Sequence, residues 1–128
     1  MELLFSMMAG SRTDKAGFLT EDMKGFFRDM AQAVAGYGAL RLGLLEMGSR
    51  PVAAVLCFDY NNGVYLYNSG YNPSYARLSA GLISKLEAIR WAIQQKKKVF
   101  DFLKGAEVYK ERLGGLRLSL SSCRISPA

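Results

Sequence analysis

The chain contains no histidine, and its 128 residues include only two cysteines, three prolines and one tryptophan. Without histidine, the most common general base and the most common metal ligand are missing, as are Ser-His and Cys-His nucleophilic pairs. The two cysteines, Cys57 and Cys123, are too few for a disulfide framework and have no metal-ligand spacing. Acid–base chemistry must therefore use carboxylate, tyrosine, lysine or cysteine side chains or the substrate itself, and we expect no bound metal.

Long hydrophobic runs are also missing. The longest apolar stretches, such as residues 52–58, are far shorter than the ~20 residues that a membrane-spanning helix needs. Residues 1–9 are hydrophobic, but Glu2 interrupts them and no basic segment precedes them, so we expect no signal peptide. These features predict a cytoplasmic protein without a membrane span.

Half of the residues are apolar and 22% are charged, which is typical of a soluble globular protein. We expect one domain over 1–128, with an N-terminal helix and linker in 1–17 and the core in 18–128. The net charge is +6, and from residue 96 onward eight Lys and Arg stand against three Asp and Glu. This bias favours an anionic partner, such as a phosphate-bearing cofactor or RNA. A solvated surface is the alternative, and for residues 96–98 after a helix it is the better one.

Hydrophobic periodicity predicts an α+β order of elements. Asn62-Gly63 is a strong hairpin signal, and Thr20 is a suitable N-cap for a helix. We expect helices over 1–9, over 20–36 (core stripe Met23, Phe26, Phe27, Met30 and Val34) and after Ser79 (core stripe Leu82, Ile83, Leu86, Ile89 and Ile93). We expect strands over 40–44, 52–60, 64–67, 99–103 and, half-exposed, 116–120.

The strand over 64–67, the long helix and the strand over 99–103 form a βαβ unit, so these two strands should be adjacent and parallel. The earlier strands should be antiparallel, which gives a mixed, mostly antiparallel sheet with one parallel crossover. Ligands of such units tend to bind beyond the carboxyl ends of the strands. Those ends are residues 68–71 and 104–107, where we expect functional side chains.

The start of the long helix is a candidate anion site. Ser79 is a suitable N-cap, and Gly81 has no side chain to block the first-turn amides. Free N–H groups and the helix dipole attract anions, and Arg77 lies just outside them. A capped helix that binds nothing explains the same residues, because every helix has such an end.

Two polar stretches carry side chains suited to binding and proton transfer. Residues 68–75 are rich in turn formers but also carry two tyrosines beside Asn68 and Ser69. Asp101 lies between two phenylalanines and is either paired with a cation or an acid–base group in a pocket. Residues 104–112 are dense in Lys, Glu and Tyr, and a solvated surface turn is the alternative there.

Four segments carry a family resemblance: YLYNSGYNP over 65–73, LSAGL over 78–82, AIRWAI over 88–93 and FDFLKGAEVYK over 100–110. Together they are similar to the C-terminal domain of acyltransferases of the GNAT superfamily. The closest branch is the cellulose-biosynthesis-associated CelD/BcsL-type acetyltransferases, which are related to the Fem-type aminoacyltransferases. The resemblance implies a GNAT fold in which the strands flanking the long helix splay apart around an acyl donor. The donor would be acyl-CoA, with its pyrophosphate over Arg77, Ser79, Ala80, Gly81 and Leu82.

The function implied by this resemblance is transfer of an acyl group from a thioester donor to an amine or hydroxyl acceptor. Candidate bases are Asp101 and Glu107, and candidate proton donors are Tyr71 and Tyr109. Candidate residues for binding the acceptor or phosphates are Asn68, Ser69, Lys104 and Lys110.

Two other functions fit the same resemblance. The relatives carry two GNAT-like halves, whereas this chain resembles the second, so a homodimer or a separate first half would complete the cleft. A non-catalytic half that serves as a binding or dimerisation module is one alternative. Transfer from aminoacyl-tRNA is the other, and it predicts salt-dependent RNA binding.

Overall fold

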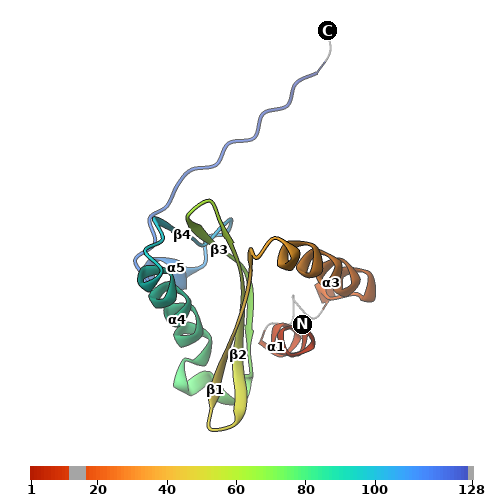
Figure 1. Ribbon diagram of the computed structural model, residues 1–128, viewed down its shortest axis with the longest axis vertical. Coiled ribbons are helices and arrows are strands. Elements are labelled where there is room, and N and C mark those ends of the chain that lie inside the picture. The colour runs from red at the N-terminus through yellow and green to blue at the C-terminus, as the bar shows by residue number, and fades with distance from the viewer. Residues whose placement is uncertain (12–16, 127–128) are drawn as a thin grey trace.

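The computed structural model describes residues 1–11 and 17–126, which form a central sheet between two layers of helices (Figure 1). The helices are α1 (Glu2–Ser11), α3 (Glu21–Gly36), the 3-10 helix η1 (Pro73–Leu78), α4 (Ala80–Gln94) and α5 (Val108–Arg112). The strands are β1 (Leu40–Met47), β2 (Arg50–Tyr60), β3 (Gly63–Tyr71) and β4 (Val99–Asp101). Most of the expected linker before Gly17 lies outside the described residues. No helix in the described ranges is both long and apolar enough to cross a bilayer.

The sheet has the order β1-β2-β3-β4, and its first three strands pair antiparallel. β4 pairs parallel with β3, with Gly63 opposite Val99 and Tyr65 opposite Asp101. Helix α4 connects these two strands, as expected of a crossover between parallel neighbours. The prediction of an α+β fold with a mixed sheet and a parallel βαβ unit is therefore confirmed.

The β2–β3 hairpin turns on Asn61 and Asn62, one residue earlier than the Asn62-Gly63 signal suggested. Both asparagines have positive φ values, 47° and 62°, and Tyr60 pairs with Gly63 across the turn. A two-residue hairpin loop that matches strand twist needs positive φ at both positions, and asparagine tolerates that conformation better than most residues.

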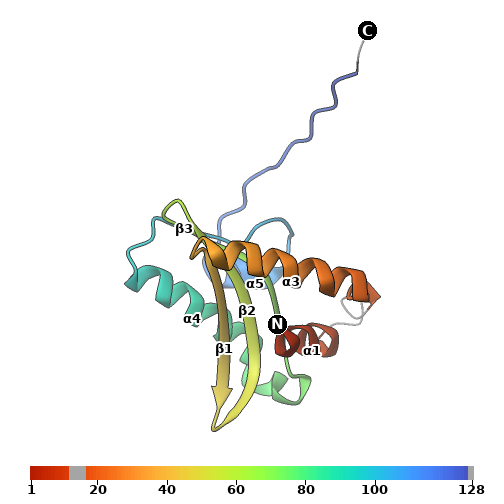
Figure 2. The same cartoon turned by 45° about the vertical axis from the view of Figure 1, so that its right-hand side comes forward.

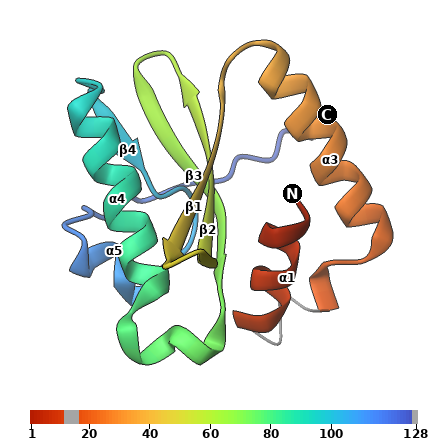
Figure 3. The ribbon, with the colours of Figure 1, turned by 60° about the horizontal axis from the view of Figure 1, so that its bottom comes forward.

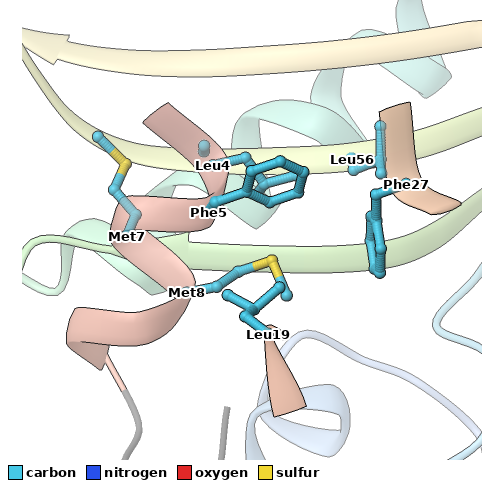
Figure 4. Packing of buried hydrophobic residues seen from close by; sticks show 8 residues of the cluster. Leu4, Phe5, Met7, Met8, Leu19, Phe27 and Leu56 are labelled. Atoms are coloured by element: carbon cyan, nitrogen blue, oxygen red, sulfur yellow. The ribbon is translucent and has the colours of Figure 1, made fainter. Parts of the chain in front are cut away.

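Helices α1 and α3 cover one face of the sheet, and α4 covers the other (Figure 3). The core on the α1 side is shown in Figure 4, and its buried members are Leu4, Phe5, Met7, Met8, Leu19, Phe27, Ala54 and Leu56. The Thr20 hydroxyl accepts a hydrogen bond from the Met23 N–H at 3.2 Å, so the predicted N-cap is confirmed. Of the predicted α3 stripe, Phe27 is fully buried, but Phe26 is 53% exposed.

Helix α4 packs on the sheet through a face that only partly overlaps the one predicted. Of the expected stripe, Ile83, Leu86 and Ile93 are 39%, 50% and 69% exposed, whereas Leu82 and Ile89 are half-buried. The buried positions of the helix are Ala80, Ser84, Lys85 and Ala92. Three of these four are small, which lets the helix backbone lie close to the β-branched and aromatic side chains of the sheet. The periodicity identified the helix correctly but only one edge of the face that it buries.

The expected final strand over 116–120 is wrong. The backbone after α5 has no strand or helix in the described residues, and it runs away from the body of the molecule (Figures 1 and 2). Leu116, Leu118 and Leu120 are 92%, 85% and 77% exposed. Alternation shows that a segment is suited to be a strand, but a strand also needs a neighbour, and the described chain places none beside it.

Gly70 is the point at which β3 touches the backbone of α1. A Cβ atom there would lie 2.4 Å from the Met7 carbonyl carbon and 2.4 Å from the Met8 nitrogen. We expect Gly70→Ala to lower the free energy of unfolding by about 2 kcal/mol, because the clash is with backbone and helix α1 must shift. Urea titration followed by circular dichroism measures this change.

The matched control is Gly25→Ala in the second turn of α3, where an added Cβ meets nothing within 4 Å. Helix propensity predicts that this variant is more stable by about 0.5–1 kcal/mol. Equal effects of the two substitutions would show that α1 does not pack on β3 in this way.

Candidate functional site

A wedge opens where β3 and β4 separate. The two strands pair over three residues of each strand, after which β3 continues to Tyr71 while β4 ends at Asp101. Tyr67 is an extra residue on β3, because Leu66 pairs with Cys57 and Asn68 with Leu56. Such a bulge bends a strand and increases its twist, which turns the second half of β3 away from the line of β4.

The wedge holds a cavity of about 520 Å³. One wall is the second half of β3, the other is the segment that follows β4, and α4 contributes a single side chain. Its lining residues are Ser11, Leu66, Tyr67, Asn68, Ser69, Gly70, Tyr71, Lys85, Phe102, Leu103, Lys104, Glu107, Tyr109 and Lys110. Seven of the side chains predicted from sequence therefore come together here: Asn68, Ser69, Tyr71, Lys104, Glu107, Tyr109 and Lys110.

Lys85 is a site residue that the sequence analysis missed. It lies on the buried face of α4 and is only 8% exposed. Its ammonium donates a hydrogen bond to the Gly81 carbonyl at 2.7 Å and lies 4.7 Å from the centre of the Tyr109 ring. The sequence held no signal for this position, because a lysine beside an apolar stripe on a helix is usually solvated.

Lys110 holds together the segment that follows β4. Its ammonium donates to the carbonyls of Leu103, Lys104 and Gly105 at 3.1, 3.0 and 3.2 Å. It also lies 2.9 Å from the Glu107 Oε2 atom. An ammonium has three N–H donors, so these contacts occupy all of them. Lys110 thus fixes the loop, and a ligand phosphate would have to displace one of these contacts to reach it.

Glu107, Tyr109 and Tyr71 present polar atoms to the cavity from both walls. The Glu107 side chain is 40% exposed and is held by Lys110, one helical turn later. The Tyr109 ring packs edge-on against Phe102, with 6.1 Å between ring centres. Tyr71 lines the opposite wall. A carboxylate and two phenols beside a buried ammonium are groups that can take up, deliver and stabilise charge during proton transfer.

The comparisons with known proteins agree with this geometry. Residues 1–111 match the family described as acetyltransferase (GNAT) domain. This chain belongs to the GNAT acetyltransferase family. Its structure also resembles the apo crystal structure of aminoglycoside antibiotic 6'-N-acetyltransferase AAC(6')-IG from Acinetobacter haemolyticus, with a TM-score of 0.52. The two share 16% sequence identity over 80% of this chain and 82% of that one. A comparison with curated protein sequences found no match.

Membership of the family confirms the GNAT fold and the acetyltransferase class. GNAT acetyltransferases generally use acetyl-CoA as the acyl donor. Within residues 1–11 and 17–126, no group of three or more histidine, cysteine, aspartate or glutamate side chains is placed to hold a metal ion.

Asp101 of this GNAT domain has a structural partner. Its Oδ1 atom accepts the backbone N–H of Leu103 at 2.7 Å. Leu103 has a φ of 56°, so the carboxylate stabilises a left-handed turn just after β4. Asp101 is not among the residues that line the wedge cavity. The position of Asp101 outside the cavity therefore does not support the general-base role predicted for it.

The start of α4 differs from the expected capped helix. Ser79 has a φ of 54°, and its side chain makes no capping hydrogen bond. Its carbonyl instead accepts the N–H groups of Leu82 and Ile83 at 2.8 and 2.9 Å. Ala80 is only 1% exposed, and a Cβ on Gly81 would lie 2.7 Å from the Tyr71 ring.

The five predicted donor-binding positions, Arg77, Ser79, Ala80, Gly81 and Leu82, do not line the wedge cavity. Tyr71 links the two regions, because it lines the cavity and its ring occupies the space that a side chain on Gly81 would need. A donor that lies across both regions must therefore pass this ring.

Neither cysteine of the GNAT domain is placed as a nucleophile in the wedge. Cys57 is buried in β2, and burial raises the pKa of its thiol to about 12, so it stays protonated at neutral pH. Cys123 is exposed on the segment after α5. Both thiols are free in the structure.

Proposed function

We propose that this GNAT domain transfers an acyl group from a thioester donor, acyl-CoA, to an amine or hydroxyl acceptor in the wedge between β3 and β4. The observation that supports this proposal is the cavity itself, where two parallel strands part and Glu107, Tyr109 and Lys85 meet. We place the chain in the CelD/BcsL-type branch, on the motifs over 65–73 and 100–110.

In the proposed reaction, Glu107 takes the proton of the acceptor as its nitrogen or oxygen attacks the thioester carbonyl carbon. The carbon–sulfur bond then breaks, and the Tyr109 hydroxyl delivers a proton to the leaving thiolate. The proton that Glu107 has gained returns to Tyr109 through solvent, which completes the cycle. Lys110 keeps the Glu107 carboxylate at the cavity, and Lys85 supplies positive charge beside the Tyr109 ring.

Binding of the two substrates is assigned to the remaining predicted residues. Asn68, Ser69 and Lys104 line the cavity and would contact the acceptor, with Tyr71 as a second proton donor. The Asn68 side chain already accepts the Ser69 N–H at 2.9 Å, which orders this stretch of β3. Arg77 and the start of α4, residues 79–82, would receive the donor phosphates beyond the Tyr71 ring.

The test combines calorimetric titration with acetyl-CoA, coenzyme A and a tRNA acceptor-stem RNA with turnover measurements on an amine panel. We expect acetyl-CoA to bind, and Glu107→Gln to lower kcat about 10²–10⁴-fold with donor affinity retained, because a general base contributes that factor. Tyr109→Phe should lower kcat in the same way. Asp101→Asn is the matched control, since its amide oxygen can still accept the Leu103 N–H.

Three outcomes would contradict the proposal. Binding of the RNA with a steep salt dependence and none of acetyl-CoA would indicate an aminoacyl-tRNA-dependent transferase. No affinity for either donor would indicate a non-catalytic module. Full activity of Glu107→Gln together with loss in Asp101→Asn would reverse the roles of the two carboxylates.

A further inference from the structure

A second hollow lies on the sheet face that α4 covers, between β1 and α4. It is an apolar groove of about 530 Å³, and its floor is formed by Val55, Cys57 and Val64, all buried. The other lining residues are Arg41, Leu42, Gly43, Leu44, Leu45, Ser84, Glu87, Ala88 and Trp91. The groove lies on the other side of β2 and β3 from the core of α1 and α3, and it shares no lining residue with the wedge cavity.

The groove exists because β1 is an edge strand of the described sheet. The sheet order leaves β1 with β2 as its neighbour on one side, so its eight residues offer a free backbone edge on the other. Small residues on both sides, Gly43 on β1 and Ala88 on α4, leave the space above the floor open. Natural sheets usually cover or charge such an edge. On the groove side β1 has one charge, Arg41, beside Gly43 and Leu45, whereas Leu42 and Leu44, 38% and 45% exposed, lie on the α3 side with their partners Leu56 and Ala54.

The segment after α5 is an extended stretch whose leucines are exposed and have no surface of the described chain to pack against. Its leucines at 116, 118 and 120 alternate with Arg117, Ser119 and Ser121, so an extended backbone puts all three leucines on one side. Its start is fixed, because the Gly115 N–H donates to the Lys110 carbonyl at 2.8 Å and Arg117 pairs with Glu111. From there the segment runs away from its own sheet (Figures 1 and 2), and the three leucines are among its most exposed residues.

We propose that residues 116–120 of a second copy add as a strand beside β1, with their three leucines in the groove. Addition of an extended segment to a free edge combines backbone hydrogen bonds with pockets for alternate side chains, which matches both surfaces. Two copies make this contact reciprocally, as a two-fold dimer with exchanged segments.

The dimensions favour β1 over the other free edge. Five extended residues span about 17 Å, which eight-residue β1 can accommodate, whereas β4 has only three residues. The segment also leaves the body at α5, whose Tyr109 packs on Phe102 just after β4. That exit lies at the far edge of the sheet from β1, so a second copy is the donor of the strand.

Sedimentation velocity of the full chain over a range of concentrations tests the exchange, with Leu118→Arg against Ser119→Arg as a matched pair. Both add one positive charge to the same exposed segment, but only Leu118 points into the groove. We expect a concentration-dependent dimer whose dissociation constant rises about a hundredfold in Leu118→Arg, since each of two interfaces loses a leucine worth about tenfold. Ser119→Arg should leave the dimer intact.

A groove variant, Ala88→Arg, completes the design. It should also raise the dissociation constant, and an equimolar mixture with Leu118→Arg should associate more tightly than either variant alone, because one of the two contacts in the mixed dimer joins an intact segment to an intact groove. Restored association also shows that Ala88→Arg is folded. Hydrogen exchange should show protected amides over 40–47 in the dimer and not in Leu118→Arg.

A chain that stays monomeric at all concentrations would overturn the proposal, as would a dimer that Leu118→Arg does not weaken. A monomer with protected amides over 116–120 would show that the segment docks on its own chain, which also overturns it.

Discussion

Replacement of Phe27 by alanine is expected to lower the free energy of unfolding by about 4 kcal/mol. Phe27 is 1% exposed and stands where α3 meets α1 and the sheet. Its ring centre lies 5.9 Å from that of Phe5 and 5.7 Å from that of Tyr67 (Figure 4 shows Phe5 and Phe27). Removal of the ring therefore costs both its buried area and the cavity left between three elements. Urea titration of the full chain measures the change.

The preceding residue provides the control. Phe26 is on the same helix and has the same side chain, but it is 53% exposed. We expect Phe26→Ala to cost less than about 1 kcal/mol, because most of the ring already contacts water. Similar losses for both variants would mean that α3 does not pack on the sheet through the face described.

Replacement of Lys110 by methionine is expected to cost about 3 kcal/mol of stability and to abolish most activity. The lysine is 9% exposed, and its loss leaves three carbonyls and the Glu107 carboxylate without their shared cation. The loop that carries Glu107 and Tyr109 then loses its anchor. Because a misplacement of about 1 Å can cost a factor of about 100 in rate, we expect kcat to fall by at least that factor.

Lys104→Met is the matched control, because Lys104 is exposed in the same loop and lines the same cavity. Its stability should stay within about 0.5 kcal/mol of the wild type. Thermal unfolding and turnover measured on both variants separate an anchoring lysine from a ligand-binding one. Unchanged stability in Lys110→Met with a raised KM would show that Lys110 binds ligand instead.

Much of the candidate site was predictable because its side chains lie in two stretches marked by polar composition. The polar residues after 67 and after 103 pointed to the two walls of the wedge, and seven of the predicted side chains line it, although residues 68–71 belong to β3 rather than to a loop after it. Lys85 and the structural role of Asp101 were not predictable. A lysine on a helix is usually solvated. From sequence alone, an aspartate that caps a turn cannot be distinguished from one that transfers a proton.

The helices also show which features local sequence predicts and which depend on tertiary packing. Thr20, the acidic first turn and the apolar spacing located α3 within a residue or two, because capping and periodicity act over a few neighbouring positions. On α4, Ile83, Leu86 and Ile93 faced outward, whereas Ala80, Ser84 and Ala92 faced the sheet together with the half-buried Trp91. The space between two packed elements, rather than hydrophobicity, selected that face.

Local sequence alone was sufficient for the order of elements up to α5, the hairpin, the crossover and the mixed sheet, since each depends on propensities, turn residues and period within one segment. Tertiary packing was needed for three features: the bulge-driven separation of β3 from β4, the buried Lys85 and the unpaired segment over 116–120. Each depends on which distant parts of the chain lie beside the segment or fail to do so. The side-chain pattern of a segment shows which residues it could bury. Which residues are in fact buried depends on the parts of the structure that pack against the segment.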